Sequence, residues 1–531
     1  MTRWGWVALG AGSWLLAACG SGGGSTGGGR DGGGGRVDAG PPPAPSDGCA
    51  SFLERVPMAD FTAPDHVIGD GTPASCTEAA LRAAVDAGGT IVFDCGDAEH
   101  VIDIGEPLRL VLGGPDVAVD GGGRIVLDGG GEGRLFELDS SFERGEPTLT
   151  VQGLTLRNGR ARMSDGDDGP GRGGGAIWNL GGTLVVIDSV FDGNVTPESG
   201  PDIAGGALYT VGDGAMYVVR SVFTNNRGAS GGAIGNLIND FFVLDTVMAG
   251  NAATGLGTGG GNGGAIYSDG VEQEAVLCGT ELRDNDARVL GGGIFRVSNT
   301  PSGTQLITRT LIADNVVENR ELSGAGGAYL QGMEVTAVDS ALVRNEAPGS
   351  GGLFLGPGGT RVDFLNVMIA DNQATDSLGG GLSVDESVTG RLRFVTVAGN
   401  GARDEDSFAA GMFGGGQLTL EAVIFADNEA GNEFTPITCT TTQREGGGNV
   451  QWPVERAGGG SDDPDALCTP GIRIVDPQMG ALEDRSGGTG TYPVRVPGDV
   501  DAVAVAEGCP ATDLLGSPRG DRCSAGAVDA E

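Results

Sequence analysis

Apart from carboxylates, the residue types that carry enzyme chemistry are sparse in this chain. Its two histidines, His66 and His100, lie in no motif with a nucleophilic serine or cysteine, so a catalytic triad has no support. All 32 basic residues are arginine, so no lysine can accept a proton. The 71 acidic residues leave one route open, because carboxylates from facing segments can form an acid–base pair. The sequence itself names no catalytic residue.

One acidic loop has residues that could bind a cation. Asp165, Asp167 and Asp168 lie among glycines and are candidate Ca²⁺ ligands. The loop lacks the complete ligand series and the distal glutamate of a recognisable calcium loop, so a solvated acidic loop is the favoured interpretation. No cofactor is expected other than this Ca²⁺.

The cysteines predict disulfides. After Cys19, eight remain, an even number that suits an oxidising compartment. Three near pairs would staple the two ends of the fold: Cys76 with Cys95, Cys439 with Cys468, and Cys509 with Cys523. Cys49 and Cys278 are left over, and either pair with each other or stay free.

The elements that must position these residues come from a repeat. An apolar residue, two variable residues and an asparagine recur nine times, at intervals of 25 to 34 residues. The asparagines are Asn194, Asn226, Asn251, Asn285, Asn315, Asn345, Asn372, Asn400 and Asn428. A second motif, of the type Gly174-Gly175-Ala176-Ile177, precedes a strand-like stretch in each unit. Such self-similarity indicates a solenoid.

The type of solenoid follows from the residues within each unit. No unit contains a long amphipathic helical pattern, whereas short runs rich in Val, Ile, Leu, Phe and Thr indicate strands. A leucine-rich repeat needs an aliphatic residue five positions before each asparagine, but Ser or Thr stands there in six of the nine units. A parallel β-helix fits better, because its coils stack at about 4.8 Å and bring like residues into register. The apolar column from Phe191 to Phe425 should point inward.

An aromatic column follows the glycine motif, at Trp178, Tyr209, Tyr267, Phe295 and Phe413. Rings that point outward could bind the faces of sugars. The neighbours two residues away on the aromatic side are more consistently apolar than those on the opposite side. We therefore expect an internal stack of rings.

Together these motifs resemble the polymorphic outer membrane protein repeats of the right-handed, pectin-lyase-like parallel β-helix. The resemblance covers about half the chain. Upstream, Cys76 to Val85 followed by Thr90 to Asp94 is similar to the short helix and first strand that open bacterial surface β-helices. Segments from Asp476 to Val528 resemble the closing part of cell-surface β-helix proteins. The resemblance implies a surface or adhesion role.

The N-terminus predicts a lipid anchor. Arg3 and an apolar run lead to Leu16-Ala17-Ala18-Cys19, a lipobox in which Cys19 would carry the lipid. Gly20 follows Cys19 in place of an inner-membrane retention aspartate, which points to the outer membrane or cell surface. The segment up to about Ser46 is rich in Gly, Ser, Asp and Pro and should be a flexible tether.

The expected organisation is therefore a signal peptide at 1–18, a tether at 19–47, an N-terminal cap at 48–98, β-helix repeats at 99–435 and a C-terminal cap at 436–531. The net charge of −39 should repel nucleic acid and acidic polymers.

We expect a lipid-anchored, all-β, right-handed parallel β-helix with a short N-terminal capping helix, acting as a non-enzymatic adhesion or structural scaffold. Its expected partners are the outer membrane, through the lipid, and glycans or other surface proteins. Two alternatives remain open. A carboxylate cluster across coils would favour a polysaccharide lyase or glycoside hydrolase, and outward-facing rings would favour a glycan-binding module.

Overall fold

The computed structural model describes residues 47–143, 145–162, 173–200, 203–256, 259–318, 324–376, 379–402, 404–405, 407–432, 436–454, 467–505 and 508–530. All of them belong to one compact unit, Arg36–Glu531. Among these residues no helix is long and apolar enough to cross a membrane.

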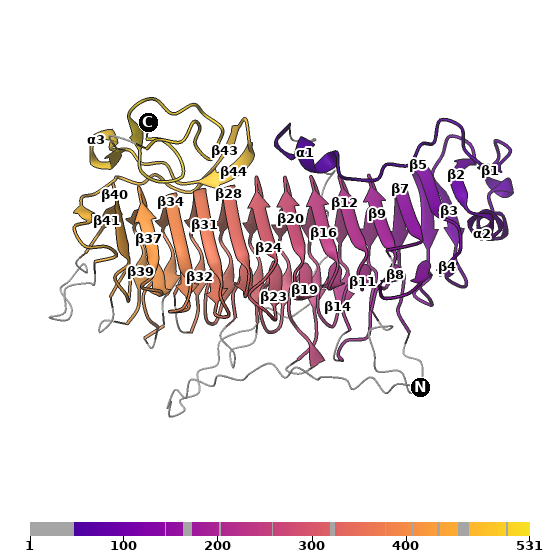
Figure 1. Ribbon diagram of the computed structural model, residues 1–531, viewed down its shortest axis with the longest axis horizontal. Helices are drawn as coiled ribbons and strands as arrows, with labels where there is room; N and C mark the ends of the chain where they lie inside the picture. Colours follow the sequence, from indigo (N-terminus) through magenta and orange to yellow (C-terminus); the bar gives the residue numbers. More distant parts are fainter. Residues whose placement is uncertain are drawn as a thin grey trace. The chain divides into compact units, whose positions relative to one another are not determined.

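The chain winds into a parallel β-helix whose three walls are sheets A, B and C (Figure 1). Sheet A is the largest, and its strands are β1 (His66–Gly69), β2 (Gly89–Asp94), β3 (His100–Asp103), β5 (Val117–Asp128), β7 (Thr148–Arg157), β9 (Thr183–Ile187), β10 (Val190–Asp192), β12 (Ala215–Val219), β13 (Val222–Thr224), β16 (Asp240–Leu244), β17 (Val247–Ala249), β20 (Glu274–Cys278), β21 (Glu281–Arg283), β24 (Thr304–Thr308), β25 (Leu311–Ala313), β28 (Glu334–Val343), β31 (Arg361–Ala370), β34 (Thr389–Ala398), β37 (Leu418–Glu421), β38 (Ile424–Ala426), β40 (Arg444–Gly447), β41 (Val450–Trp452) and β42 (Arg473–Ile474).

Sheet B contains β4 (Leu108–Val111), β6 (Phe136–Asp139), β8 (Ile177–Leu180), β11 (Leu208–Val211), β15 (Ile234–Leu237), β19 (Ile266–Gly270), β23 (Ile294–Ser298), β27 (Ala328–Gln331), β30 (Leu353–Gly356), β33 (Leu382–Val384) and β36 (Met412–Gly414). Sheet C contains the short strands β14 (Arg227–Gly228), β18 (Ala252–Ala253), β22 (Asp286–Ala287), β26 (Val316–Val317), β29 (Glu346–Ala347), β32 (Gln373–Ala374), β35 (Gly401–Ala402) and β39 (Glu429–Ala430). One coil runs, for example, through β11, β12, β13 and β14 before β15 begins the next.

The asparagine column forms a continuous ladder inside the solenoid. Each amide nitrogen from Asn194 to Asn400 donates to the amide oxygen of the next asparagine, as from Asn285 Nδ2 to Asn315 Oδ1 at 2.9 Å. The same nitrogen donates to a backbone carbonyl of the preceding coil, which for Asn285 is that of Met248 at 2.9 Å. Because these asparagines are almost fully buried, the ladder satisfies polar groups that have no access to water. The predicted ladder is confirmed.

The apolar column is also confirmed, since its members from Phe191 to Phe425 all belong to the main interior core. Phe191 and Phe223 stack there with ring centroids 4.7 Å apart. The glycine motif marks a corner where coils approach closely. A Cβ atom on Gly206 would lie 2.1 Å from the carbonyl oxygen of Gly232, so no side chain fits.

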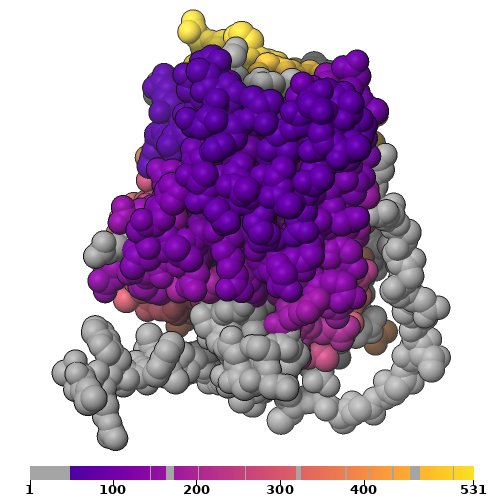
Figure 2. All heavy atoms as spheres, turned by 90° about the vertical axis from the view of Figure 1, so that its right-hand side faces the viewer, coloured from indigo at the N-terminus to yellow at the C-terminus, as the bar shows by residue number. Residues whose placement is uncertain are grey.

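The N-terminal end is closed by helix α2 (Glu78–Ala87), as the sequence predicts. The Thr77 side chain accepts a hydrogen bond from the Ala80 backbone at the start of the helix. Leu81 and Val85 are buried in the main core and cover the first coils. Figure 2 looks onto this end, where the N-terminal part of the described chain covers the solenoid. The Cys76–Cys95 disulfide fastens the region.

A short segment, residues 47–56, crosses the outer face of sheet A, and we call it the strap. It includes the 3-10 helix η1 (Asp47–Cys49) and helix α1 (Ala50–Leu53), and the Cys49–Cys278 disulfide bonds it to β20. Arg55 makes two hydrogen bonds of 2.8 Å to Glu274 and lies over the Phe242 ring. The strap therefore covers apolar residues on the outside of sheet A.

The C-terminal segment, residues 475–505 and 508–530, folds back along sheet A (Figure 1). It contains the antiparallel pair β43 (Glu483–Gly487) and β44 (Gly490–Val494), helix α3 (Val500–Val503), and the pair β45 (Ala504–Val505) and β46 (Cys523–Ser524). Its apolar residues pack on the outward side of sheet A. Cys439–Cys468 lies in the interior core, whereas Cys509–Cys523 lies on this lateral face and does not staple an end.

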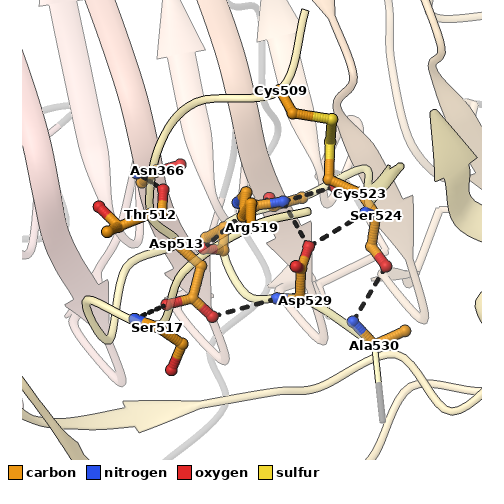
Figure 3. A network of polar contacts seen from close by, with 12 residues as sticks. Asn366, Cys509, Thr512, Asp513, Ser517, Arg519, Cys523, Ser524, Asp529 and Ala530 are labelled. Atoms are coloured by element: carbon orange, nitrogen blue, oxygen red, sulfur yellow. Dashed lines mark hydrogen bonds and ion pairs between the residues drawn. A yellow bond between two sulfur atoms is a disulfide. The ribbon is translucent and has the colours of Figure 1, made fainter. Parts of the chain in front are cut away.

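A buried polar network holds this segment in place (Figure 3). The Arg519 guanidinium forms an ion pair of 2.7 Å with Asp529 and donates to three backbone carbonyls. It lies over the Phe394 ring of sheet A, with its central carbon 4.9 Å from the ring centroid. Asp513 accepts hydrogen bonds from the backbone of Leu515, Ser517 and Asp529.

Candidate functional site

The aromatic column lies on the outer face of sheet B, so the predicted internal stack is wrong. The interior side of these strands carries Ile177, Leu208, Ile266 and Ile294, and all of them belong to the main core. The rings alternate with those residues along each strand and therefore face outward. Trp178, Tyr209 and Tyr267 form a separate cluster outside the core.

The prediction failed because the interior accepts polar residues at this corner. Asn179 points inward, donates to the Gly182 carbonyl at 2.7 Å and accepts from the Gly182 backbone at 2.9 Å. Arg296, fully buried, donates to Gln305 Oε1 and to the Gln273 carbonyl. These side chains satisfy the backbone of the turn between sheets B and A. Because these inward-facing side chains are polar, comparing the polarity of the two faces assigned the inner face to the outside.

Four rings form an uninterrupted stack, which we call the ring strip: Tyr267, Phe295, Tyr329 and Phe354. They occupy one register position on β19, β23, β27 and β30. Successive ring centroids lie 5.5, 5.1 and 4.9 Å apart. Phe295 is 8% exposed and the other three rings are half-buried. The strip is thus the edge of an aromatic stack at the protein surface.

Two of these rings, Tyr329 and Phe354, were missed from the sequence. In these coils the glycine pair stands one residue closer to the strand, as in Ala325-Gly326-Gly327-Ala328-Tyr329. Counting from the strand would have found both rings, because Phe295 pairs with Tyr329 and Tyr329 with Phe354. Of the predicted rings, Phe413 contacts Phe408 at 5.2 Å and is separated from the strip by Ser383.

The next outward column carries a polar residue on two of the four coils, Asp269 and Gln331, and the other two coils place Val297 and Gly356 there. The Tyr329 hydroxyl donates to Gln331 Oε1 at 2.8 Å, and the Tyr267 hydroxyl contacts Asp269 Oδ2 at 3.4 Å. Asn299 Nδ2 donates to the other oxygen of Asp269 at 2.8 Å. Burial raises the pKa of Tyr329 to about 12, and the charge of Asp385 adds to the shift. The phenol therefore stays protonated and able to donate at neutral pH.

A pair of carboxylates meets across coils on the side of sheet C. Asp286 begins β22, and Glu318 follows β26 on the next coil. Burial raises the pKa of Asp286 to about 7, and the charge of Glu318 and a hydrogen bond to it add to the shift. Arg288 lies 3.9 Å from Glu318 and opposes the shift. A hydrogen bond between the two carboxyl groups would hold them closer together than the pairs of about 5–9.5 Å that glycosidases use.

Other residues singled out in the sequence have structural roles or lie outside the described residues. His66 and His100 each contact a backbone carbonyl near the N-terminal cap, those of Gly88 and Cys76. All eight cysteines after Cys19 form disulfides, and the leftover pair Cys49–Cys278 joins the strap to sheet A. Cys19 and the candidate Ca²⁺ ligands Asp165, Asp167 and Asp168 lie outside the described residues. Within those residues no group of acidic, histidine or cysteine side chains is arranged to hold a metal.

Comparison with known proteins gives a likeness of fold. No protein-family model and no curated protein matches this chain. Among solved structures, the periplasmic alginate epimerase AlgG is similar with a TM-score of 0.36 and 13% identity, over 74% of this chain and 87% of the epimerase. Two mutant forms of that epimerase give a TM-score of 0.29 and 12% identity, over 67% of this chain and 76% of theirs. A likeness this distant says nothing about activity.

Proposed function

We propose that this protein is an extracytoplasmic glycan-binding β-helix that holds a polysaccharide along the outer face of sheet B. The observation that carries the proposal is the ring strip, a stack of four aromatic side chains that faces outward. Burying such rings in the core would have favoured the scaffold interpretation. Their position outside it favours the glycan-binding alternative.

The geometry of the strip defines how a glycan would be held. Since each ring covers the face of its neighbour, the surface presents ring edges and hydroxyl groups rather than open faces. The rings repeat at 4.9 to 5.5 Å, which is comparable to the length of one extended hexose unit. A polysaccharide lying parallel to the solenoid axis would therefore place one sugar on each coil, with Gln331 and Asp269 beside it to bind hydroxyl groups.

The strip favours neutral glycans. Asp269 and Asp385 lie beside it, and the whole chain carries a net charge of −39. An acidic polymer would be repelled by both the local and the total charge. Several weak contacts along consecutive coils would add up to useful affinity for a long chain but little for a single sugar.

The site of action is proposed to lie outside the cytoplasm. Four disulfides suit an oxidising compartment. The lipobox at Cys19 and an outer-membrane or cell-surface location stay predictions from the sequence, as does Ca²⁺ binding by the acidic loop. Radiolabelled palmitate incorporation in the native host, lost in Cys19→Ala, would test the anchor.

A carbohydrate-active enzyme is the second candidate, and the observation in its favour is the Asp286–Glu318 pair. A carboxyl group that keeps its proton near neutral pH is suited to general acid catalysis. The two groups would have to separate to admit a substrate. Product analysis of any glycan that binds, with Asp286→Asn beside the unmodified protein, separates the two candidates. Turnover that Asp286→Asn abolishes would favour the enzyme.

The direct test of the main proposal is binding of the whole protein to a panel of neutral and acidic polysaccharides. Retention by neutral β-linked glycans, weakened by substitution of Tyr329 and Phe354, would support it. Equal retention of the variants would reject the ring strip as the binding surface.

A further inference from the structure

A pocket of about 200 Å³ opens near the N-terminal end of the solenoid, on different elements from the ring strip. Phe93 and Cys95 line it from the coil of β2, and Asp120, Gly121, Gly122 and Arg124 line it from the coil of β5. Its size suits one monosaccharide rather than a chain.

The pocket exists because two neighbouring coils interrupt the hydrogen-bonded ladder of sheet A at adjacent positions. Strand β2 ends at Asp94, and sheet A resumes only at His100. In β5 the register with β7 shifts between Asp120 and Ile125, so residues 121–124 bulge out of the ladder. Later coils make the same bend around one left-handed residue, such as Asp188.

The two walls of the pocket differ in what shapes them. Gly122 and Gly123 have φ angles of 57° and 73°, a conformation in which consecutive residues with side chains are rarely found. On the facing wall, the Cys76–Cys95 disulfide holds Cys95 in place. The disulfide wall is held before a ligand arrives, which lowers the entropy cost of binding on that side.

The pocket offers one hydrogen-bond acceptor, Asp120, and one cation, Arg124. The Asp120 carboxylate accepts from the Gly122 backbone at 2.8 Å and from Gln152 Nε2 at 3.1 Å, so it is oriented as an acceptor. The Arg124 side chain is 58% exposed, and its ion-pair partner is Asp97, at 3.8 Å and fully exposed. Such a contact contributes little, which leaves the guanidinium available to an incoming anion.

We propose that this pocket binds one hexuronate unit, a sugar that carries a single carboxylate. The ligand carboxylate would pair with Arg124, its hydroxyl groups would donate to Asp120, and its apolar face would contact the half-buried side chain of Val92, which pairs in register with Asp120. The total negative charge is spread over the chain and is screened by salt beyond about 10 Å, so it opposes one carboxylate beside Arg124 less than it opposes an acidic polymer. The site goes beyond the glycan binding proposed for the ring strip.

Isothermal titration of the whole protein with D-glucuronate, D-glucose and L-leucine tests the proposal. D-glucuronate should bind, and D-glucose should bind at least about ten-fold more weakly because it lacks the carboxylate. Arg124→Ala should lower the affinity for D-glucuronate by a similar factor. Arg361→Ala, at a comparably exposed arginine elsewhere on sheet A, should leave it unchanged.

A second variant does not depend on charge. Val92→Phe enlarges a half-buried lining residue and should abolish binding of D-glucuronate. Circular dichroism checks that each variant is folded. Binding of L-leucine in place of D-glucuronate, equal binding of D-glucose, or full affinity in folded Arg124→Ala would each overturn the proposal. Retention on polysaccharide through the ring strip should be the same in both pocket variants, so the two proposals can fail separately.

Discussion

The ring of Tyr329 stacks on the ring of Phe354 on the outer face of sheet B, with centroids 4.9 Å apart and planes inclined by 11°. The two residues pair in register on adjacent coils, and both are half-buried. An aromatic stack therefore reaches the surface of the solenoid. The hydroxyl of Tyr329 donates to Gln331, which gives the strip a polar contact at this coil.

The phenol of Tyr329 can be tested without disturbing the stack. Tyr329→Phe keeps the ring and removes the hydroxyl, so it should weaken glycan retention while the melting temperature changes little. Because burial raises the pKa of Tyr329 to about 12, retention by the unmodified protein should be the same at neutral pH and at pH about 9. A loss of retention by pH 9 would contradict the assigned role.

Substitution of an asparagine in the middle of the ladder should destabilise the protein more than substitution at its end. Asn285→Ala removes donors to Met248 and Asn315 and the acceptor for Asn251, so it should destabilise the protein by about 3 kcal/mol or more. Asn428 is the last asparagine of the column, and its amide nitrogen donates only to Val397 in the described chain. Chemical denaturation should therefore show a smaller loss for Asn428→Ala. An equal loss at both positions would contradict the ladder as a cooperative element.

The attachment of the strap to sheet A should depend on the Cys49–Cys278 disulfide. Cys49 and Cys278 are 229 residues apart in sequence, so loop entropy alone allows a contribution of up to about 5 kcal/mol. The Cys49→Ser, Cys278→Ser double variant should release the strap to proteases and expose the apolar patch of sheet A to a hydrophobic dye. The Cys509→Ser, Cys523→Ser double variant is the control, because its disulfide lies in another segment. Unchanged cleavage near Val56 would contradict this role.

The carboxylate pair predicts a defined pH dependence. The pKa of Asp286 is about 7 in the folded protein against 3.8 ordinarily, so the folded state retains a proton that the unfolded chain releases. The resulting stability is fully present below pH about 4 and is lost as the pH rises to about 7. Asp286→Asn should raise the melting temperature at pH about 8 and change it little at pH about 4. The same effect at both pH values would contradict the shifted pKa.

The C-terminal segment should be released by removal of one carboxylate. Asp529→Ala leaves the Arg519 guanidinium, whose side chain is 0% exposed, without its ion-pair partner. Breaking a buried pair in this way costs about 3 kcal/mol or more. Hydrogen exchange in residues 508–530 should increase, whereas Asp521→Ala, at an exposed position, should have no effect. Unchanged exchange in Asp529→Ala would show that packing alone holds the segment.

The columns of the β-helix were predictable because each coil contributes one residue of the same type to each column. The spacing of Asn285 and Asn315 thus predicted a contact that the structure confirms. The direction of the rings was not predictable by comparing polarity, because Asn179 and Arg296 are polar and yet point inward to satisfy a turn.

Contacts made by residues outside the repeat could not be predicted from periodicity in the sequence. The C-terminal segment has no copies along the chain, so its packing on sheet A follows only from the three-dimensional shape of that face. The meeting of Asp286 with Glu318 depends on the register between two coils whose connecting loops differ in length. The Cys49–Cys278 bond was one of two open possibilities and needed the fold to decide it.

The measurement that tests the central claim most directly is affinity electrophoresis of the whole protein in gels containing neutral β-linked polysaccharides. The Tyr329→Ala, Phe354→Ala double variant and Phe142→Ala, at an exposed ring outside the strip, are compared with the unmodified protein. The account predicts strong retardation of the unmodified protein and of Phe142→Ala, and loss of at least about ten-fold in affinity for the folded double variant. Equal retardation of all three proteins, or no retardation of any, would contradict glycan binding by the ring strip.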